Sequence, residues 1–450
     1  MENVREIRLL RELITHGLWD EVADTCARMY VQDIAEALSG VQDEALPKAF
    51  MILPEDQHAG VFAYIELPVQ HRLLEMLDDE AGRKLMAGLS PDDRTALLQS
   101  VNKEEAEQLL RLLSADDMRV ALELLGYPAH SVGRLMTTRF VTLRPDWSLS
   151  EALAHVRRQG QGEETINTLY VTDARGHLAG TVSLKRLVML APEETVGQVV
   201  SGPLVTVQAA EDRTEAVRLI QHYDITALPV VDSRGILLGV VTVDDVMDVA
   251  EAENTEDFHK IGGVGAVALS LRDARPSLLY RKRVGWLVLL VFMNIFGGAG
   301  IAYFEETIEA VIALVFFLPL IVDSGGNAGS QSATLMVRAL ATGDVQSKDW
   351  LKLWGKELGV ALALGLTMGA AVWGLGLWRG GSEVALVVSL AMVLVVMMGS
   401  MIGMLLPFLL TRMKFDPATA SAPLITSIAD IAGILIYFSI ATAILTIPTT

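Results

Sequence analysis

The pattern of hydrophobic and polar positions divides the chain near residue 260. Before that point apolar residues form short periodic runs, and after it they form long stretches. A spacing of three or four residues, typical of amphipathic helices, dominates residues 1–128. Leu53-Pro-Glu-Asp and Leu77-Asp-Asp-Glu begin 24 residues apart, as do Leu89-Ser-Pro-Asp-Asp and Leu113-Ser-Ala-Asp-Asp. This repeat predicts short helices stacked into an N-terminal α-helical superhelix.

Residues 129–249 contain two copies of a different pattern. Each copy reads as strand, helix, strand, Asp-x-x-Gly turn, strand and helix. The turn residues Asp173 and Asp232 are 59 positions apart, whereas the strands that open the two copies are 64 apart. The first copy therefore holds about five extra residues, most simply within the Gly-Gln-Gly-Glu-Glu run at 160–164. We predict a tandem α/β unit.

Residues 250–275 form an acidic connector between this unit and the apolar part. From the end of the tandem unit into the connector, apolar residues keep helical spacing at Val246, Val249, Phe258 and Ile261. The other positions of this stretch are rich in acids that only Lys260 clearly opposes. Like charges three or four residues apart destabilise a helix, and closely packed carboxylates suit hard cations. We predict a metal-responsive connecting helix; the alternative is an ordinary solvated helix face.

The apolar part, residues 276–450, holds five stretches long enough to cross a bilayer. The predicted spans cover residues 284–302, 309–337, 357–378, 384–410 and 423–447. Eleven Lys and Arg residues flank the ends on the N-terminal side of the membrane, and Arg379 alone flanks the other side. This asymmetry predicts that the N-terminal domains are cytoplasmic and that the C-terminus lies outside.

The second span contains Pro-Leu-Ile-Val-Asp-Ser-Gly-Gly-Asn-Ala-Gly, in which Gly325 and Gly326 would interrupt an ordinary helix. Non-helical backbone at membrane depth is tolerated only against protein or water. Asn327 brings amide groups to the same place. We predict a broken helix beside an ion path, and the alternative is a tight helix crossing mediated by small residues.

The fifth span contains Asp430, the only charged residue after Pro423. A carboxylate at membrane depth costs at least about 3 kcal/mol unless it faces water or a partner. We therefore expect Asp430 to line an ion path. The alternative is a structural carboxylate whose hydrogen bonds are satisfied.

The composition narrows the range of possible functions. Residues 1–260 carry 44 acidic and 24 basic side chains, whereas residues 261–450 carry 11 and 12. A soluble part with this acidic excess attracts cations and repels nucleic acid. Cys26 is the only cysteine, so no disulfide framework exists, and no signal peptide is visible. No nucleophile elbow, P-loop, His-Glu-x-x-His or paired Cys motif points to an enzyme.

The tandem unit resembles a pair of cystathionine-β-synthase (CBS) domains, on the basis of Leu228-Pro-Val-Val-Asp and Gly239-Val-Val-Thr. The resemblance implies a site for ATP or another adenine nucleotide, with Thr242 and Asp245 holding the ribose. The first copy departs from this pattern at its equivalent positions, so one ribose site at most is supported. A regulatory scaffold without nucleotide is the alternative.

The whole order of domains resembles the MgtE family of magnesium channels. The most specific matches are residues 325–344, Phe415-Asp-Pro, and Pro423-Leu-Ile-Thr-Ser-Ile-Ala-Asp. The resemblance implies a multidomain α-helical integral membrane protein of the bacterial inner membrane. It implies an N-terminal superhelix, a CBS pair, a connecting plug helix at 250–275 and a five-helix transmembrane domain. It further implies a homodimer with a pore on the two-fold axis.

The resemblance also implies site residues. In the pore, Asp430 from both subunits would bind hydrated Mg²⁺, close to Gly325, Gly326, Asn327 and Asp323. Regulatory Mg²⁺ would bind the acids Asp92, Asp245, Asp248, Glu253, Glu256, Asp257 and Asp416. For Asp92, helix capping in the first turn after Ser90 is the alternative role. The chain departs from the family at Ala96, where a second acid is expected, and at Asp323, where a small neutral residue is common.

These features predict an Mg²⁺-selective channel or transporter for magnesium uptake that intracellular Mg²⁺ closes. Mg²⁺ gives up its water reluctantly and is usually held by one or two carboxylates, so one Asp per subunit is suitable. Two alternatives stay open. One is a non-conducting membrane sensor of Mg²⁺ or nucleotide, and the other is a transporter of another divalent cation such as Co²⁺.

Overall fold

The computed structural model describes residues 2–160, 163, 165–200, 202–265 and 274–445. The chain forms two compact units, Met1–Glu251 and Ala252–Thr450. Part of the Gly-Gln-Gly-Glu-Glu run, part of the connector and the last residues of the predicted fifth span therefore lie outside the described residues.

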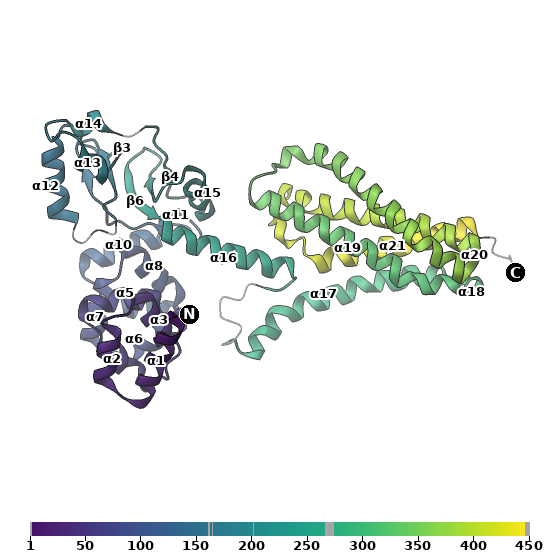
Figure 1. Cartoon of the computed structure of the whole chain (residues 1–450), viewed down its shortest axis with the longest axis horizontal. Helices are drawn as coiled ribbons and strands as arrows, with labels where there is room; N and C mark the ends of the chain where they lie inside the picture. The colour runs from purple at the N-terminus through teal and green to yellow at the C-terminus, as the bar shows by residue number, and fades with distance from the viewer. Residues whose placement is uncertain (1, 161–162, 164, 201, 266–273, 446–450) are drawn as a thin grey trace. The chain divides into compact units, whose positions relative to one another are not determined.

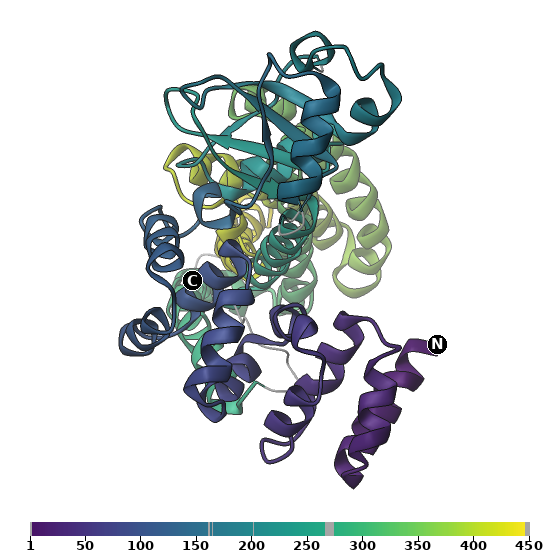
Figure 2. The same ribbon diagram turned by 90° about the vertical axis from the view of Figure 1, so that its left-hand side faces the viewer.

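The N-terminal part of the first unit is an array of short helices that lie side by side (purple to blue in Figure 2). They are α1 (Glu2–His16), α2 (Trp19–Cys26), α3 (Val31–Ser39), α4 (Leu46–Met51), α5 (His58–Tyr64), α6 (Leu67–Met76), α7 (Asp79–Gly88), α8 (Pro91–Ser100), α9 (Lys103–Arg111) and α10 (Ala115–Leu125). One apolar core runs through the array, from Ile7 on α1 to Ala121 on α10. The predicted superhelix is confirmed.

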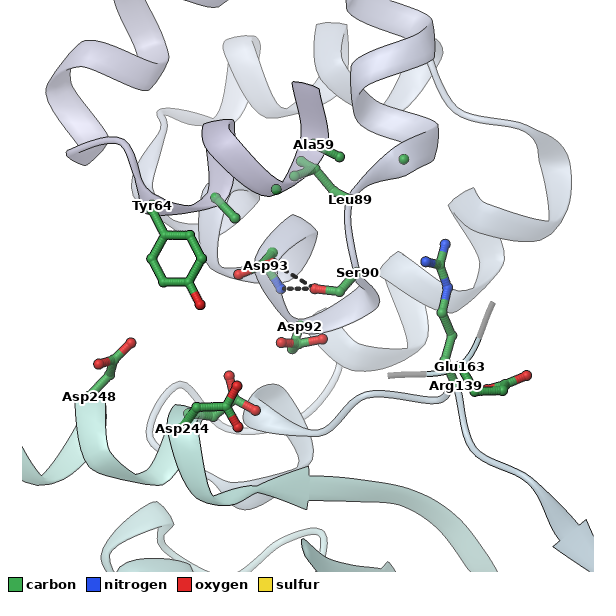
Figure 3. Close-up of a pocket in the computed structure, with 14 residues that line it drawn as sticks. Ala59, Tyr64, Leu89, Ser90, Asp92, Asp93, Arg139, Glu163, Asp244 and Asp248 are labelled. Atoms are coloured by element: carbon green, nitrogen blue, oxygen red, sulfur yellow. Dashed lines mark hydrogen bonds between the residues drawn. The ribbon is translucent and has the colours of Figure 1, made fainter. Parts of the chain in front are cut away.

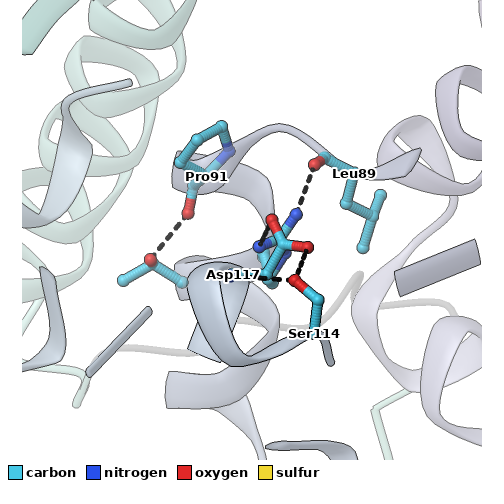
Figure 4. A network of polar contacts seen from close by, with 6 residues as sticks. Leu89, Pro91, Ser114 and Asp117 are labelled. Atoms are coloured by element: carbon cyan, nitrogen blue, oxygen red, sulfur yellow. Dashed lines mark hydrogen bonds and ion pairs between the residues drawn. The ribbon is translucent and has the colours of Figure 1, made fainter. Parts of the chain in front are cut away.

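A buried arginine ties α8 to α10 within this array. Arg94 is 1% exposed, donates from Nη1 to Asp117 at 3.0 Å and donates from Nη2 to the Leu89 carbonyl at 3.0 Å. Asp117 also accepts a hydrogen bond from Ser114, which caps α10 (Figure 4). A buried charge needs such partners, because removal of one leaves the other uncompensated.

The second part of the first unit holds two three-stranded sheets of the same topology. The strands are β1 (Thr142–Leu143), β2 (Thr168–Thr172) and β3 (Leu178–Ser183), then β4 (Val207–Gln208), β5 (Ala227–Val231) and β6 (Leu237–Thr242). In each sheet the first strand pairs parallel with the second, and the second pairs antiparallel with the third. The helices here are α11 (Val132–Leu135), α12 (Leu149–Gln159), α13 (Leu184–Met189), α14 (Val196–Val199) and α15 (Arg213–Tyr223).

Reciprocal bonds between the turns join the two copies. The Leu178 N–H donates to the Gly235 carbonyl at 3.1 Å, and the Leu237 N–H donates to the Gly176 carbonyl at 3.1 Å. Gly176 and Gly235 have φ of +85° and +83°, a conformation that glycine adopts without strain. The predicted duplication is confirmed, and the Asp-x-x-Gly signal marks the turns that connect the copies.

Helix α16 (Val243–Ile261) follows β6 directly. It begins inside the region predicted to be the second copy, so the connecting helix is an extension of the tandem unit. Val246 and Val249 bury one face of its start. The helix ends at Gly262 and Gly263, and Gly263 has φ of +68°.

The second unit holds α17 (Pro276–Tyr303), α18 (Glu305–Ala310), α19 (Ala313–Ala341), α20 (Trp350–Arg412) and α21 (Ala422–Ile444). Four of these helices, α17, α19, α20 and α21, are long and apolar enough to cross a membrane. Helices α19, α20 and α21 pack against one another (Figure 1).

Helix α20 supplies two crossings. Its 63 residues are too many for one crossing, which needs about 20 residues, and the backbone reverses at Gly381 (φ 78°, ψ −172°). A Cβ on Gly365 would lie 2.9 Å from the Val393 carbonyl oxygen, and one on Gly369 would lie 3.0 Å from the Ser389 carbonyl oxygen. The two legs therefore pack closely as a hairpin, and the described helices make five crossings, as predicted.

The prediction of a broken second span is wrong, because α19 continues through the whole Gly-Gly-Asn stretch. The glycines serve a close crossing instead. A Cβ on Gly403 would lie 2.7 Å from the Gly329 carbonyl carbon, and one on Gly399 would lie 2.8 Å from the Gly325 carbonyl carbon. Backbone touches backbone at both points, so the alternative of a crossing mediated by small residues is correct.

Candidate functional site

The membrane carboxylate Asp430 lies on α21, half-buried. Its Oδ1 atom is buried and has no hydrogen-bond partner among the described residues. Asp323 on α19 lies close enough for its charge to act on Asp430. Asn327, one turn further along α19, donates from Nδ2 to Asp323 at 3.0 Å. Two acids and an amide therefore lie together at membrane depth.

Close contacts between α19 and α21 on both sides of Asp430 fix this arrangement. One turn before Asp430, a Cβ on Gly326 would lie 2.8 Å from the Thr426 methyl carbon. On the other side, a Cβ on Gly433 would lie 3.9 Å from the Val322 Cα. The helices run antiparallel through these contacts, so Asp430 is level with Asp323.

A second acidic site occupies a cavity of about 490 Å³ in the first unit. Asp92 and Asp93, in the first turn of α8, face it from one side, and Asp244 and Asp248 on α16 face it from the other (Figure 3). Asp245 lines it as well. Of the predicted metal ligands, Asp92, Asp245 and Asp248 are thus brought together, and the sequence analysis missed Asp93 and Asp244.

Burial and neighbouring acids raise the pKa of two carboxylates in this cavity, which Arg139 also lines. Burial raises the pKa of Asp93, a bond from Ser90 lowers it, and the charge of Asp244 raises it further. Burial also raises the pKa of Asp248, and the charges of Glu251, Asp244 and Asp93 add to the increase. A cation in the cavity would relieve both effects.

No group of three or more His, Cys, Asp or Glu side chains in the described part of the chain is close enough to hold a metal ion as the side chains stand. The acids of the cavity face one space without converging on one centre. Binding of a bare cation by several of them would require the walls to approach, whereas a hydrated cation reaches further.

A third cluster lies in the second unit, where α16 ends. Lys260 Nζ donates to Asp416 at 2.5 Å and to Glu256 at 2.8 Å. Burial lowers the pKa of Lys260, but the two acids outweigh it and hold the pKa above its usual value. Burial and the charge of Asp416 raise the pKa of Asp257, and the charge of Glu253 contributes. Of the predicted ligands of this region, Glu256, Asp257 and Asp416 therefore lie around Lys260, and Glu253 lies close enough to Asp257 for its charge to act on it.

Both oxygens of the Asp416 carboxylate accept hydrogen bonds. Oδ2 accepts from Lys260, and Oδ1 accepts from the Ala418 N–H at 2.9 Å and caps the short helix η4 (Pro417–Thr419). Nearby, a Cβ on Gly263 would lie 2.6 Å from the Trp286 ring and 3.4 Å from Pro423. The residues that directly follow α16 thus pack against Trp286 within α17 and against the start of α21.

The two residues predicted to bind ribose, Thr242 and Asp245, form a hydrogen bond with each other. The Thr242 hydroxyl, at the end of β6, donates to Asp245 Oδ2 at 2.5 Å. Asp245 also lines the acidic cavity, so one carboxylate is shared between the predicted nucleotide and metal sites.

The sequence analysis missed a polar pair inside the membrane part. Ser400, 1% exposed on the second leg of α20, donates to Glu357 Oε1 on the first leg at 2.5 Å. The hydrophobic pattern puts Glu357 at the edge of the third span, but the helix begins earlier, at Trp350. The acid therefore lies inside the helix, and only the true helix start reveals this.

Comparison with known families covers most of the chain. Residues 318–440 match the MgtE family described as a divalent cation transporter. Residues 29–130 match the MgtE intracellular N domain, and residues 132–193 and 196–252 match the CBS domain. Each match falls on the part of the structure with the corresponding fold.

Two relatives span nearly the whole chain. A protein named magnesium transporter MgtE from Thermus thermophilus is 37% identical over 97% of this chain and 98% of its own. A protein of the same name from Bacillus subtilis is 31% identical over 92% of this chain and 94% of its own.

Two solved structures each resemble slightly more than half of the chain. The soluble part of a magnesium transporter has a TM-score of 0.52 at 25% identity and covers 56% of this chain and 99% of that one. The cytosolic domain of the Mg²⁺ channel MgtE in complex with ATP has a TM-score of 0.51 at 32% identity. It covers 53% of this chain and 98% of that one. With the full-length relatives, these matches show that the chain belongs to the MgtE family of membrane transporters.

Proposed function

We propose that this protein conducts Mg²⁺ across the membrane through a path lined by Asp430, and that intracellular Mg²⁺ closes the path. The observation that carries the proposal is the partly buried Asp430 carboxylate, whose Oδ1 has no hydrogen-bond partner among the described residues. An intramembrane acid in this state is costly unless a cation or water meets it. The names of the full-length relatives support Mg²⁺ as that cation.

The proposed path uses a hydrated ion. Mg²⁺ keeps several waters when one or two carboxylates bind it, and weak binding through those waters permits release. We propose a homodimer in which Asp430 of each subunit faces the two-fold axis. Asp323 would then add a second acid on each side, and its bond from Asn327 would fix its position.

Closure by Mg²⁺ follows from the acidic clusters. Without cations, the acids on α8 repel those at the start of α16, and Mg²⁺ between them would stabilise the closed arrangement. A ligand shifts such an equilibrium only by its difference in affinity between the two states. The residues that directly follow α16 contact Trp286 and Pro423, so movement of α16 would reach the helix that carries Asp430.

Nucleotide binding is a further part of the proposal. Thr242 and Asp245 are the residues we assign to ribose binding, and a structural relative of the first unit was solved with ATP. ATP would have to displace the hydrogen bond between these two side chains. Orientation with the N-terminal domains in the cytoplasm and location in the bacterial inner membrane complete the proposal.

Purified full-length protein in liposomes, with an internal Mg²⁺-sensitive dye, tests conduction. We expect unaided Mg²⁺ influx from the wild type and loss of at least nine-tenths of it in Asp430→Asn, which keeps the shape and removes the charge. Asp344→Asn, at an exposed acid after α19, is the matched control and should conduct normally.

Each contrary result has a distinct meaning. Wild-type rates in Asp430→Asn would refute the pore assignment. No flux from folded wild-type protein would favour the non-conducting sensor. Faster transport of Co²⁺ than of Mg²⁺ would favour the other divalent transporter.

A further inference from the structure

We propose that a groove at the end of the second leg of α20 binds an anionic phospholipid. The groove encloses about 800 Å³. It is lined by Lys348, Trp350, Ile402, Leu405, Leu406, Phe408, Leu409, Arg412 and Ile428. The lining combines two cations with a predominantly apolar wall and contains no acid.

The length of the apolar wall fits one acyl chain. Ile402 and Arg412 are ten residues apart on one helix, which corresponds to about 15 Å at 1.5 Å per residue. The hydrocarbon core of a bilayer is about 30 Å thick, so this wall spans about one leaflet. The groove therefore extends from the level of the headgroups toward the middle of the bilayer.

The charged end of the groove fits a phosphate. Lys348 and Arg412 are exposed, and neither makes an ion pair with an acid in the described residues. Asp349, the nearest acid in sequence, accepts from the Gln346 N–H at 3.0 Å and is not part of the lining. Trp350 is 45% exposed beside the cations, and tryptophan favours the membrane interface.

Charge complementarity selects the occupant. Basic pockets between transmembrane helices on the cytoplasmic side bind anionic headgroups. A second copy of the chain would bring the same predominantly basic flank to this level, and it would leave the two cations poorly compensated. A phospholipid phosphate supplies the missing charge, while its acyl chain covers Leu405 and Leu409.

The bound lipid would also contact the helix that carries Asp430. Ile428 on α21 lines the groove two residues before Asp430, whereas the rest of the apolar wall from Ile402 onward belongs to α20. An acyl chain here would therefore stabilise the packing of α21 on α20. This inference rests on the proposed membrane placement and does not require that the protein conducts Mg²⁺.

The test measures lipid binding by full-length protein in a neutral detergent. Native mass spectrometry counts bound dioleoyl phosphatidylglycerol against dioleoyl phosphatidylcholine, and thermal unfolding reports stabilisation by each. The test variant carries both Lys348→Gln and Arg412→Gln. The matched control is Lys352→Gln with Lys414→Gln, which removes two exposed basic residues that do not line the groove.

We expect the wild type and the control to bind phosphatidylglycerol about thirtyfold more tightly than phosphatidylcholine, because two interfacial cations contribute about 1 kcal/mol each. The Lys348/Arg412 pair should lose this preference. The proposal would be overturned if the Lys348/Arg412 double variant kept the wild-type preference for phosphatidylglycerol. It would also be overturned if the wild type showed no such preference.

A labelling experiment tests the competing occupant. Leu409→Cys, at a side chain that is 53% exposed, should react with a membrane-soluble maleimide in lipid-free detergent and become protected by phosphatidylglycerol. Protection without lipid would mean that a second copy covers the groove and would overturn the proposal. Asp430→Asn should keep its lipid preference, so failure of conduction and failure of lipid binding are distinguishable.

Discussion

A methyl group added to Gly403 should destabilise the membrane part, because α19 and α20 meet there with no side chain between them. A Cβ on Gly403 would lie 2.7 Å from the Gly329 carbonyl carbon, 3.0 Å from its Cα, and closer still to its carbonyl oxygen. All three atoms belong to backbone, so no side chain can rotate away. The helices would have to separate.

The size of the effect follows from two opposing contributions. Overpacking of a close-packed interface typically costs about 1–3 kcal/mol, and the backbone contact favours the upper end. Alanine has a better helix propensity than glycine by about 1 kcal/mol. The net destabilisation is therefore about 2 kcal/mol, which for a domain of this size lowers the apparent Tm by about 4–8 °C.

Thermal unfolding of full-length protein in detergent, followed by tryptophan fluorescence, measures this change. Gly359→Ala is the matched control, because it lies on the same helix and its Cβ would meet nothing within 4 Å. We expect the control to match or slightly exceed wild-type stability. If Gly403→Ala were as stable as Gly359→Ala, the close crossing of α19 and α20 would be refuted.

Three further predictions concern charged groups. Lys260→Met should expose the 250–265 connector to limited proteolysis without Mg²⁺, with protection restored at high Mg²⁺, because Asp416 loses its counter-ion; unchanged cleavage would contradict this role. Asp248→Asn should be more stable than the wild type at neutral pH in the presence of a chelator. This difference in stability should vanish below the pKa that Asp248 has in the unfolded chain. The raised folded pKa means that the native state binds more protons, so wild-type stability falls as pH rises through that pKa, and melting curves from pH 4 to 8 measure the difference. Ser400→Ala should cost about 1–3 kcal/mol by leaving Glu357 without its donor, whereas Glu357→Gln keeps an acceptor and should melt close to the wild type.

The order and type of the elements could be predicted from the sequence. The 24-residue repeat predicted the helical array, and the 59-residue spacing of Asp173 and Asp232 predicted the duplicated sheets. Hydrophobic length predicted five crossings, although two of them are legs of one helix that reverses at Gly381. These features are local or repeated, so periodicity and length are enough to reveal them.

The candidate site could be predicted only in part. The acids at the end of α16 stood out as a charge run, but Asp416, which shares Lys260 with them, lies 156 residues further along the chain from that lysine. Asp93 and Asp244 face one cavity from α8 and α16, and no local pattern indicates that proximity. Such contacts depend on how separate helices pack.

The sequence by itself determined which segments are helices, strands and membrane spans, and it identified Asp430 as an unusual charge. The tertiary structure decided what the small and polar residues do. The glycine-rich stretch from Gly325 to Gly329 was predicted to break a helix, yet it lies in a continuous helix whose neighbour approaches at Gly399 and Gly403. The physical reason is that a missing Cβ can permit either a bend or a close contact, and only the neighbouring helix determines which one occurs.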